Sequence, residues 1–178
     1  MQILLDALFT FFRGFGFFAV IFSYLVGFFL SYNNFIKLGN FLFIDIVFNI
    51  FLKNFFKVLM GDKAYPIIGK GTRPSGAVSC GFFIPTRKVE QVSESYGMPS
   101  GHSQTFAFVT TLICLHLKKS KSKHIYKYIL LILLTITAML ARIYIEKCHT
   151  VQQTLIGATI GLLLATFLVK YYGNPFSK

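Results

Sequence analysis

Long apolar runs, separated by short polar connections, make up most of the chain. Five of these runs are long enough, or nearly so, to cross a hydrocarbon core of about 30 Å, which takes roughly 20 helical residues. The pattern predicts an all-α fold, a polytopic membrane bundle of about five transmembrane helices that forms a single domain over residues 1–178. The predicted spans cover residues 15–32, 38–60, 102–117, 125–145 and 151–171.

Two segments lie outside these runs. Residues 1–12 form at best an amphipathic helix, for which we expect a position in the membrane interface. Asp6 and Arg13 lie near the start and no small-residue cleavage site follows, so no cleavable signal peptide is expected. Residues 61–101 form one long loop rich in Gly, Pro and Ser, and loops of such length are usually functional or disordered.

The composition supports the membrane assignment. Hydrophobic residues make up 54% of the chain and charged residues only 13%. The 18 basic and 6 acidic residues give a net charge of +12, which in a soluble protein would suggest a nucleic-acid partner. Because the aromatic residues lie inside the apolar runs, we instead assign the charge to loops facing anionic lipid or phosphate, and expect no nucleic-acid partner.

The distribution of lysines predicts an orientation. The connection 118–127 contains five lysines and no acid, which is typical of a cytosolic loop. Alternation of the spans then places the long loop and the turn near 146–150 on the opposite, lumenal face. Cys80 and Cys148 lie near these two segments, and they could form a disulfide if this face is oxidising. Cys114 lies within a span.

Polar residues recur every four positions along the second run. Asp45, Asn49, Lys53 and Lys57 therefore share one face of the predicted helix. Ionisable residues within spans usually face a bundle interior. The stripe is either a bundle-facing surface with a snorkelling lysine at its end or part of a site, and the spacing alone leaves both open.

A second polar group follows the fourth run. Residues 125–171 are too long for one crossing, so the chain turns near 144–148, with Arg142 closing one helix and His149 opening the next. Gln153 lies four residues after His149 and can orient its imidazole ring. His102, in the sequence PSGH, is expected on the same membrane face.

The long loop supplies groups that bind anions. Arg73 stands beside Pro74 in GKGTRPSG, and the start of the third run exposes the backbone of Ser100, Gly101 and His102. Backbone N–H groups at a helix start bind anions, and arginine adds a bidentate grip on phosphate oxygens. An oxyanion cradle, two imidazoles and a lipid-lined wall together favour phosphoryl transfer from a lipid.

Three ordered motifs give the chain a resemblance to a known family. The type 2 phosphatidic acid phosphatases carry Lys-x6-Arg-Pro, Pro-Ser-Gly-His and Ser-Arg-x5-His-x3-Asp. This chain has RP at 73–74, PSGH at 99–102 and an arginine and histidine at 142 and 149, so the resemblance covers roughly residues 49–165. Within the family, YGMPSGHSQ and the pattern RIY…HTVQQ are most similar to the dolichyl diphosphatase branch.

The chain departs from the family pattern at three positions. Gln153 replaces the Asp of the broad family but matches the dolichyl branch, and Ala141 replaces the usual Ser. The position seven before Arg73 is Pro66, so the motif lysine is either Lys53, after an insertion of about a dozen residues, or Lys57.

The resemblance implies a mechanism that needs no metal and no cofactor. His149 would be the nucleophile that forms a phosphohistidine, with Gln153 fixing its tautomer and His102 acting as general acid and base. Phosphate oxygens would be held by one lysine, two arginines and the amides at the start of the third run. These binding residues are Lys53 or Lys57, Arg73, Arg142, Ser100 and Gly101. We expect activity that survives a chelator.

The implied function is hydrolysis of dolichyl diphosphate to the monophosphate and inorganic phosphate, which supports dolichyl phosphate recycling for N-glycosylation at the lumenal face of the endoplasmic reticulum membrane. The expected partners are a polyprenyl or dolichyl diphosphate, or another phospholipid substrate, together with membrane lipids. Two alternatives remain: a broader phosphatase of phosphatidate, sphingoid phosphate or shorter isoprenyl diphosphates, and a catalytically silent protein that binds lipid headgroups. A small channel or transporter subunit is a third and more remote one.

Overall fold

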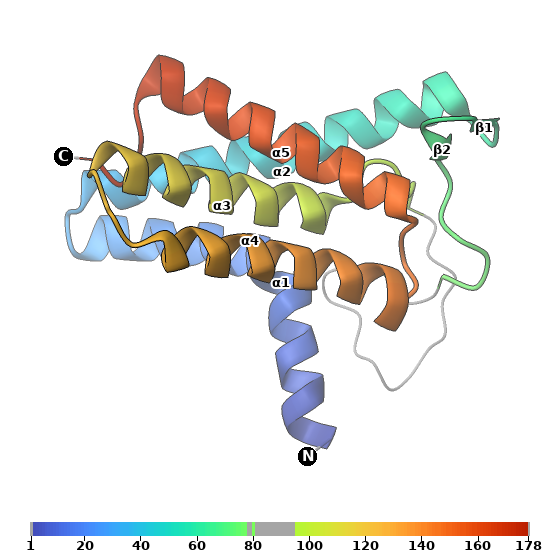
Figure 1. The fold of residues 1–178 in the computed structure, drawn as a ribbon, viewed down its shortest axis with the longest axis horizontal. Helices are drawn as coiled ribbons and strands as arrows, with labels where there is room; N and C mark the ends of the chain where they lie inside the picture. Colours follow the sequence, from blue (N-terminus) through green and yellow to red (C-terminus); the bar gives the residue numbers. More distant parts are fainter. Residues whose placement is uncertain (1, 78–79, 81–94, 178) are drawn as a thin grey trace.

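The computed structural model describes residues 2–77, 80 and 95–177, with residues 2–13 described by their backbone alone. Helices dominate this part of the chain, as the apolar pattern predicts, and the five α-helices run side by side for most of their length (Figure 1). The helices are α1 (Gln2–Phe29), α2 (Asn33–Met60), α3 (Gly101–Lys119), α4 (Ile125–Leu140) and α5 (Val151–Tyr172), with a π-helix, η1 (Ala141–Ile145), continuing α4.

The first helix starts earlier than the apolar run suggests. The segment 1–12, for which we predicted a separate interfacial position, is continuous with the first span from Gln2 onward. In Figure 1 this N-terminal part points away from the bundle at an angle to the rest of α1. The other predicted spans agree with the observed helices to within about a turn, except that α2 begins at Asn33 instead of residue 38.

Three of the helical segments are long and apolar enough to cross a membrane: α2, α4 with η1, and α5. Residues 14–29 of α1 form a shorter apolar helix. The third predicted span, α3, is less apolar because its first half is enclosed by the other helices and carries buried polar side chains, including Ser103, Gln104 and Thr105.

The helix α3 is central to the packing. It makes its most extensive contact with α5 and further contacts with α4, α2 and α1, while α1 packs against α2. The apolar faces of these helices pack against one another and form the hydrophobic core. Its buried members are Val20, Phe41, Leu42, Phe108, Leu112, Ala165 and Leu168.

Two glycines allow α5 to lie close against α3. A Cβ atom at Gly157 would collide with the carbonyl oxygen of Ser100, and one at Gly161 with that of Gln104. Small residues of this kind let helix backbones approach closely. The Ser100 amide also donates to the Gln153 carbonyl at 3.0 Å, so the first turns of α3 and α5 are fixed side by side. This contact brings the two motif histidines to the same end of the bundle.

The described part of the long loop contains a short hairpin. Strands β1 (Ala64–Tyr65) and β2 (Gly69–Lys70) pair antiparallel just after α2 ends. Residues 70–72 then run past the start of α5, where their carbonyl groups accept hydrogen bonds from the Gln153 side chain. The loop thus places Arg73 beside the turn that precedes α5.

Candidate active site

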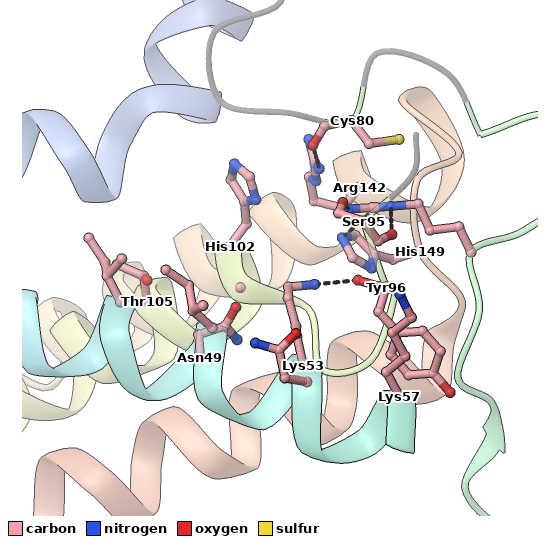
Figure 2. Close-up of a pocket in the computed structure, with 15 residues that line it drawn as sticks. Asn49, Lys53, Lys57, Cys80, Ser95, Tyr96, His102, Thr105, Arg142 and His149 are labelled. Atoms are coloured by element: carbon pink, nitrogen blue, oxygen red, sulfur yellow. Dashed lines mark hydrogen bonds between the residues drawn. The ribbon is translucent and has the colours of Figure 1, made fainter. Parts of the chain in front are cut away.

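One cavity of about 450 Å³ lies where α2, the long loop, the start of α3 and the turn before α5 meet (Figure 2). It contains seven of the nine residues predicted for the site, whereas Ser100 and Gln153 lie behind its wall and are fully buried. The predicted residues that line it are Lys53, Lys57, Arg73, Gly101, His102, Arg142 and His149. It is also lined by Ile46, Asn49, Ile50, Asn54, Cys80, Ser95, Tyr96 and Thr105.

His149 lies in the turn directly before α5 and is only 3% exposed. A capping box starts the helix: the Thr150 side chain accepts from the Gln153 backbone, and the Gln153 side chain accepts from the Thr150 backbone. The same Gln153 Oε1 lies 3.1 Å from His149 Nδ1. On the other side of the ring, Arg73 Nη1 lies 3.3 Å from Nε2.

The surrounding hydrogen bonds define the tautomer of His149. Gln153 Nε2 donates to the carbonyl oxygens of Lys70 at 2.9 Å and Thr72 at 2.7 Å, so its amide oxygen must face the imidazole. Nδ1 therefore carries the hydrogen and donates to Gln153. Nε2 is left with the lone pair, which points toward the Arg73 guanidinium and the cavity.

The environment keeps this imidazole neutral. Burial lowers the pKa of His149 well below 6.5, because removal from water penalises the charged form. The positive charges of Arg142, Arg73 and Lys53 lower that pKa further, and His102 adds to the effect. A neutral imidazole with a free lone pair is the state in which histidine acts as a nucleophile.

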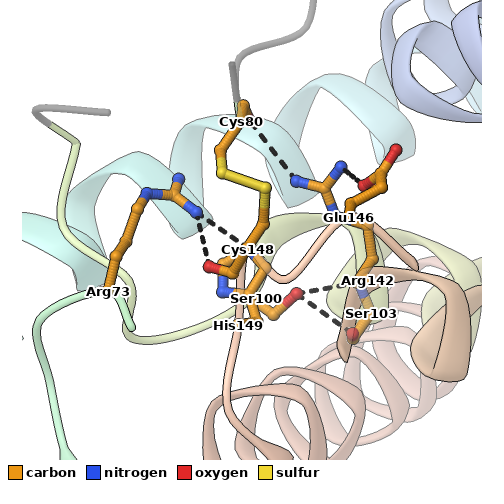
Figure 3. A network of polar contacts seen from close by, with 8 residues as sticks. All are labelled: Arg73, Cys80, Ser100, Ser103, Arg142, Glu146, Cys148 and His149. Atoms are coloured by element: carbon orange, nitrogen blue, oxygen red, sulfur yellow. Dashed lines mark hydrogen bonds and ion pairs between the residues drawn. A yellow bond between two sulfur atoms is a disulfide. The ribbon is translucent and has the colours of Figure 1, made fainter. Parts of the chain in front are cut away.

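Both predicted arginines are present in the cavity and are held by oxygen acceptors. Arg73 Nε donates to the Ser95 carbonyl at 2.9 Å, and Nη2 donates to the Ser95 hydroxyl at 2.7 Å. Burial and the charge of Arg142 lower the pKa of Arg73 to about 10, so it stays charged at neutral pH. Arg142 is 4% exposed, forms an ion pair with Glu146, and donates from Nη2 to the Cys80 carbonyl at 3.3 Å (Figure 3).

The start of α3 uses the Ser100 amide within the fold. The Ser100 amide, which we expected to bind phosphate, already donates to the Gln153 carbonyl at 3.0 Å. The Ser100 hydroxyl caps α3 by accepting from Ser103. Ser100 therefore stabilises the contact between the first turns of α3 and α5. Gly101 does line the cavity, and a Cβ atom there would lie 2.8 Å from Asn49 Oδ1.

A family model described as the PAP2 superfamily matches residues 18–177. The chain belongs to the PAP2 superfamily. No curated protein and no solved structure matched the chain. PAP2 proteins have a helical membrane fold and are phosphatases that act on lipid phosphates. The predicted fold class is therefore confirmed, and a phosphatase of lipid phosphates is the supported general activity.

The polar stripe on α2 divides into two parts in this PAP2 protein. Asp45 accepts from Gln104 at 2.8 Å and from Thr105 at 2.7 Å, and Asn49 donates to Gln104 at 2.8 Å. These contacts are mainly structural, as the bundle-facing alternative expected. The later residues of the stripe, Lys53 and Lys57, both line the cavity, and Asn49 also lines it.

The structure favours Lys53 over Lys57 as the lysine of the first PAP2 motif. Lys53 is partly buried and its Nζ donates to the Tyr96 carbonyl at 2.6 Å, while Lys57 is exposed one turn further along α2. Tyr96 is itself fixed by a hydrogen bond from its hydroxyl to the Gly61 carbonyl. Lys53 is therefore held against the segment that leads into PSGH.

We expect unequal effects from replacing these two lysines by methionine, which retains the apolar stem. Lys53→Met should lower kcat/KM by about 10² because it removes a partly buried ammonium group from the candidate site. Lys57→Met should change it by less than about fivefold, since exposed charges contribute little. Steady-state kinetics on one lipid substrate measures both variants, and a larger loss for Lys57→Met would reverse the assignment.

Three residues that hold the basic side chains of the cavity were not predicted from the sequence: Glu146, Ser95 and Tyr96. Glu146 is the acid that pairs with Arg142, and its spacing of four residues in a helical segment could have indicated this pair. Ser95 accepts from Arg73 through its carbonyl and its hydroxyl, and Tyr96 accepts from Lys53 through its carbonyl. No sequence motif indicates either contact. Within the residues that the structure describes, no group of three or more His, Cys, Asp or Glu could hold a metal ion.

Proposed function

We propose that this protein hydrolyses an isoprenyl diphosphate, of the dolichyl class, to the monophosphate and inorganic phosphate through a phosphohistidine at His149. The observation that carries the proposal is the buried neutral imidazole whose Nε2 faces a cavity containing Arg73, Arg142 and Lys53. Three cations around one nucleophile suit a terminal phosphoryl group, which spreads charge over its oxygens during transfer.

The first step transfers the terminal phosphoryl group to the enzyme. His149 Nε2 attacks phosphorus, the bond to the bridging oxygen breaks, and Arg73 exchanges its contact with the ring for one to a phosphate oxygen. Lys53 and Arg142 hold the other oxygens. His102, which lines the same cavity, gives its proton to the bridging oxygen as the lipid monophosphate leaves.

The second step returns the enzyme to its starting state. His102, now neutral, takes a proton from water as that water attacks phosphorus. The bond between phosphorus and Nε2 breaks, inorganic phosphate leaves, and His102 is protonated again. Throughout both steps Gln153 accepts the hydrogen bond from Nδ1, so the ring keeps its orientation and tautomer.

Gln153 favours a diphosphate substrate. A neutral amide raises the basicity of the imidazole less than a carboxylate would, which leaves a weaker nucleophile. A lipid monophosphate is a far better leaving group than an alcohol, so this nucleophile suffices for an anhydride. YGMPSGHSQ supports the dolichyl class in particular, while phosphatidate, sphingoid phosphate and shorter isoprenyl diphosphates remain the alternative substrates.

The proposal places the site at the lumenal face of the endoplasmic reticulum membrane, where its product would supply dolichyl phosphate for N-glycosylation. The lysine-rich connection between α3 and α4 supports a cytosolic position for the opposite end of the bundle. The Cys80–Cys148 disulfide beside the cavity supports an oxidising compartment for the site.

The test is phosphate release by purified protein in detergent from dolichyl diphosphate, farnesyl diphosphate, phosphatidic acid and sphingosine phosphate. We expect the highest kcat/KM for dolichyl diphosphate. Faster release from phosphatidic acid would assign the protein to the broader lipid phosphatases. Folded protein that releases phosphate from none of the four would favour the silent headgroup-binding alternative.

The acidic side of the pH profile should reflect the low pKa of His149. Because its folded-state pKa is depressed, the nucleophile stays neutral as pH falls through 6.5 and is lost only well below it. The acidic limb of the plot of log kcat/KM against pH, which reflects the free enzyme, should therefore have its midpoint below pH 6.5 after correction for ionisation of the substrate. Arg73→Gln should move this limb to higher pH by removing one of the charges that lower the pKa. A limb at 6.5 in both proteins would contradict this account of the ring.

A further inference from the structure

A buried disulfide lies against the two arginines of the site (Figure 3). It joins Cys80 in the long loop to Cys148 in the turn before α5, across a sequence separation of 68 residues. Both cysteines are buried, and together with Ala77 they form a small apolar cluster. The bond therefore connects the loop directly to the residue that precedes His149.

The main chain of each cysteine holds one guanidinium. The Cys148 carbonyl accepts from Arg73 Nη1 at 3.0 Å, and the Cys80 carbonyl accepts from Arg142 Nη2 at 3.3 Å. The Cys148 amide also donates to the Arg142 carbonyl at 3.0 Å. The cross-link thus joins two peptide groups that each orient a phosphate-binding arginine.

These arginines need support because the cavity collects positive charge. Arg73 and Arg142 repel each other, and Lys53 adds a third basic side chain to the same cavity. Glu146 offsets the charge of Arg142, while the acceptors recorded for Arg73 are neutral oxygens. Fixed donors stabilise a transition state best when they need no reorganisation. The disulfide provides that rigidity, because it joins the two residues whose carbonyl groups accept from Arg73 and Arg142.

We propose that Cys80 and Cys148, joined as the disulfide, are positioning residues for Arg73 and Arg142, so that phosphate binding and turnover depend on the oxidised state. The inference rests on the proposed function for the role of the arginines. A dithiol such as dithiothreitol would open the bond: the sulfur–sulfur bond breaks, two S–H bonds form, and the dithiol closes into its own cyclic disulfide. Neither cysteine itself needs to touch the substrate.

The experiment measures inorganic phosphate binding and lipid turnover on the full-length protein in detergent, before and after dithiothreitol. Alkylation and mass analysis would establish that Cys80 and Cys148 are reduced, and circular dichroism that the helices are retained. We expect reduction to weaken the binding of labelled inorganic phosphate by about tenfold and to lower kcat/KM by about 10², because two preorganised donors lose their positions. Reoxidation should restore both values.

Variants separate the disulfide from other thiol effects. Cys114→Ala removes the free cysteine and should keep both full activity and full sensitivity to dithiothreitol. A Cys80→Ala/Cys148→Ala protein should match reduced wild type and no longer respond to the reductant. Where that variant does not fold, reduction of the folded wild type alone decides the question.

Two outcomes distinguish this inference from the proposed function. Fully reduced, helical protein that binds inorganic phosphate and turns over lipid as well as the oxidised form would overturn the positioning role. Oxidised protein that binds inorganic phosphate but hydrolyses no lipid phosphate would instead overturn the proposed function. In that second case, loss of phosphate binding on reduction would still support the positioning role.

Discussion

Replacing His149 by alanine should lower kcat by at least about 10³, because the account makes its Nε2 the atom that accepts the phosphoryl group. The ring is buried, neutral and oriented by Gln153. Among the described residues, His102 is the one other histidine that lines the cavity. Phosphate release from the lipid diphosphate measures the loss. Binding of inorganic phosphate should change far less, since the lysine and the arginines remain.

His124→Ala is the matched control for this variant. His124 precedes α4 and lies outside the residues that line the cavity. It should keep wild-type kcat and KM. A His149→Ala protein that is folded and retains more than a tenth of wild-type kcat would contradict the assignment of the nucleophile.

Replacing Arg73 by lysine should lower kcat/KM by about 10²–10³, although the charge is kept. The guanidinium uses three nitrogens at once, contacting the Ser95 backbone and hydroxyl, the Cys148 carbonyl and the His149 ring. A lysine has one donor centre and cannot reproduce this geometry. Steady-state kinetics on the lipid diphosphate gives the comparison.

Lys70→Ala serves as the control for that substitution, since it removes a basic residue three positions away in β2 whose side chain is outside the cavity lining. It should leave kcat/KM within about twofold of wild type. Equal losses in the two variants would indicate a general effect of loop charge and would contradict a specific role for Arg73.

The fold was largely predictable because its helices coincide with apolar runs. Local patterns also predicted that His149 and Gln153 would pair, since a spacing of four places both on one helical turn. The motif residues at the starts of α3 and α5 could be assigned to one membrane face by counting spans. Hydrophobicity and short-range spacing therefore define the position of the site.

The remaining contacts depend on the path of the loop, which short-range patterns do not contain. Gln153 donates to carbonyl groups at residues 70–72, more than 80 positions away, and so connects the loop to the proposed nucleophile. The hydrogen bond from the Ser100 amide to the Gln153 carbonyl and the one from Lys53 to the Tyr96 carbonyl also follow from backbone positions. The sequence left the pairing of Cys80 with Cys148 undecided for the same reason, because a disulfide forms only where the fold brings the two cysteines together.

The central claim is a covalent phosphohistidine, and rapid quenching tests it most directly. Wild-type protein would be mixed with a lipid diphosphate labelled in its terminal phosphate, quenched in alkali within the first turnover, and digested for mass analysis. The account predicts label on the peptide that contains His149, stable in alkali and released by acid, and no label in His149→Ala. Burst release of phosphate with no labelled protein, or label on another residue, would contradict it.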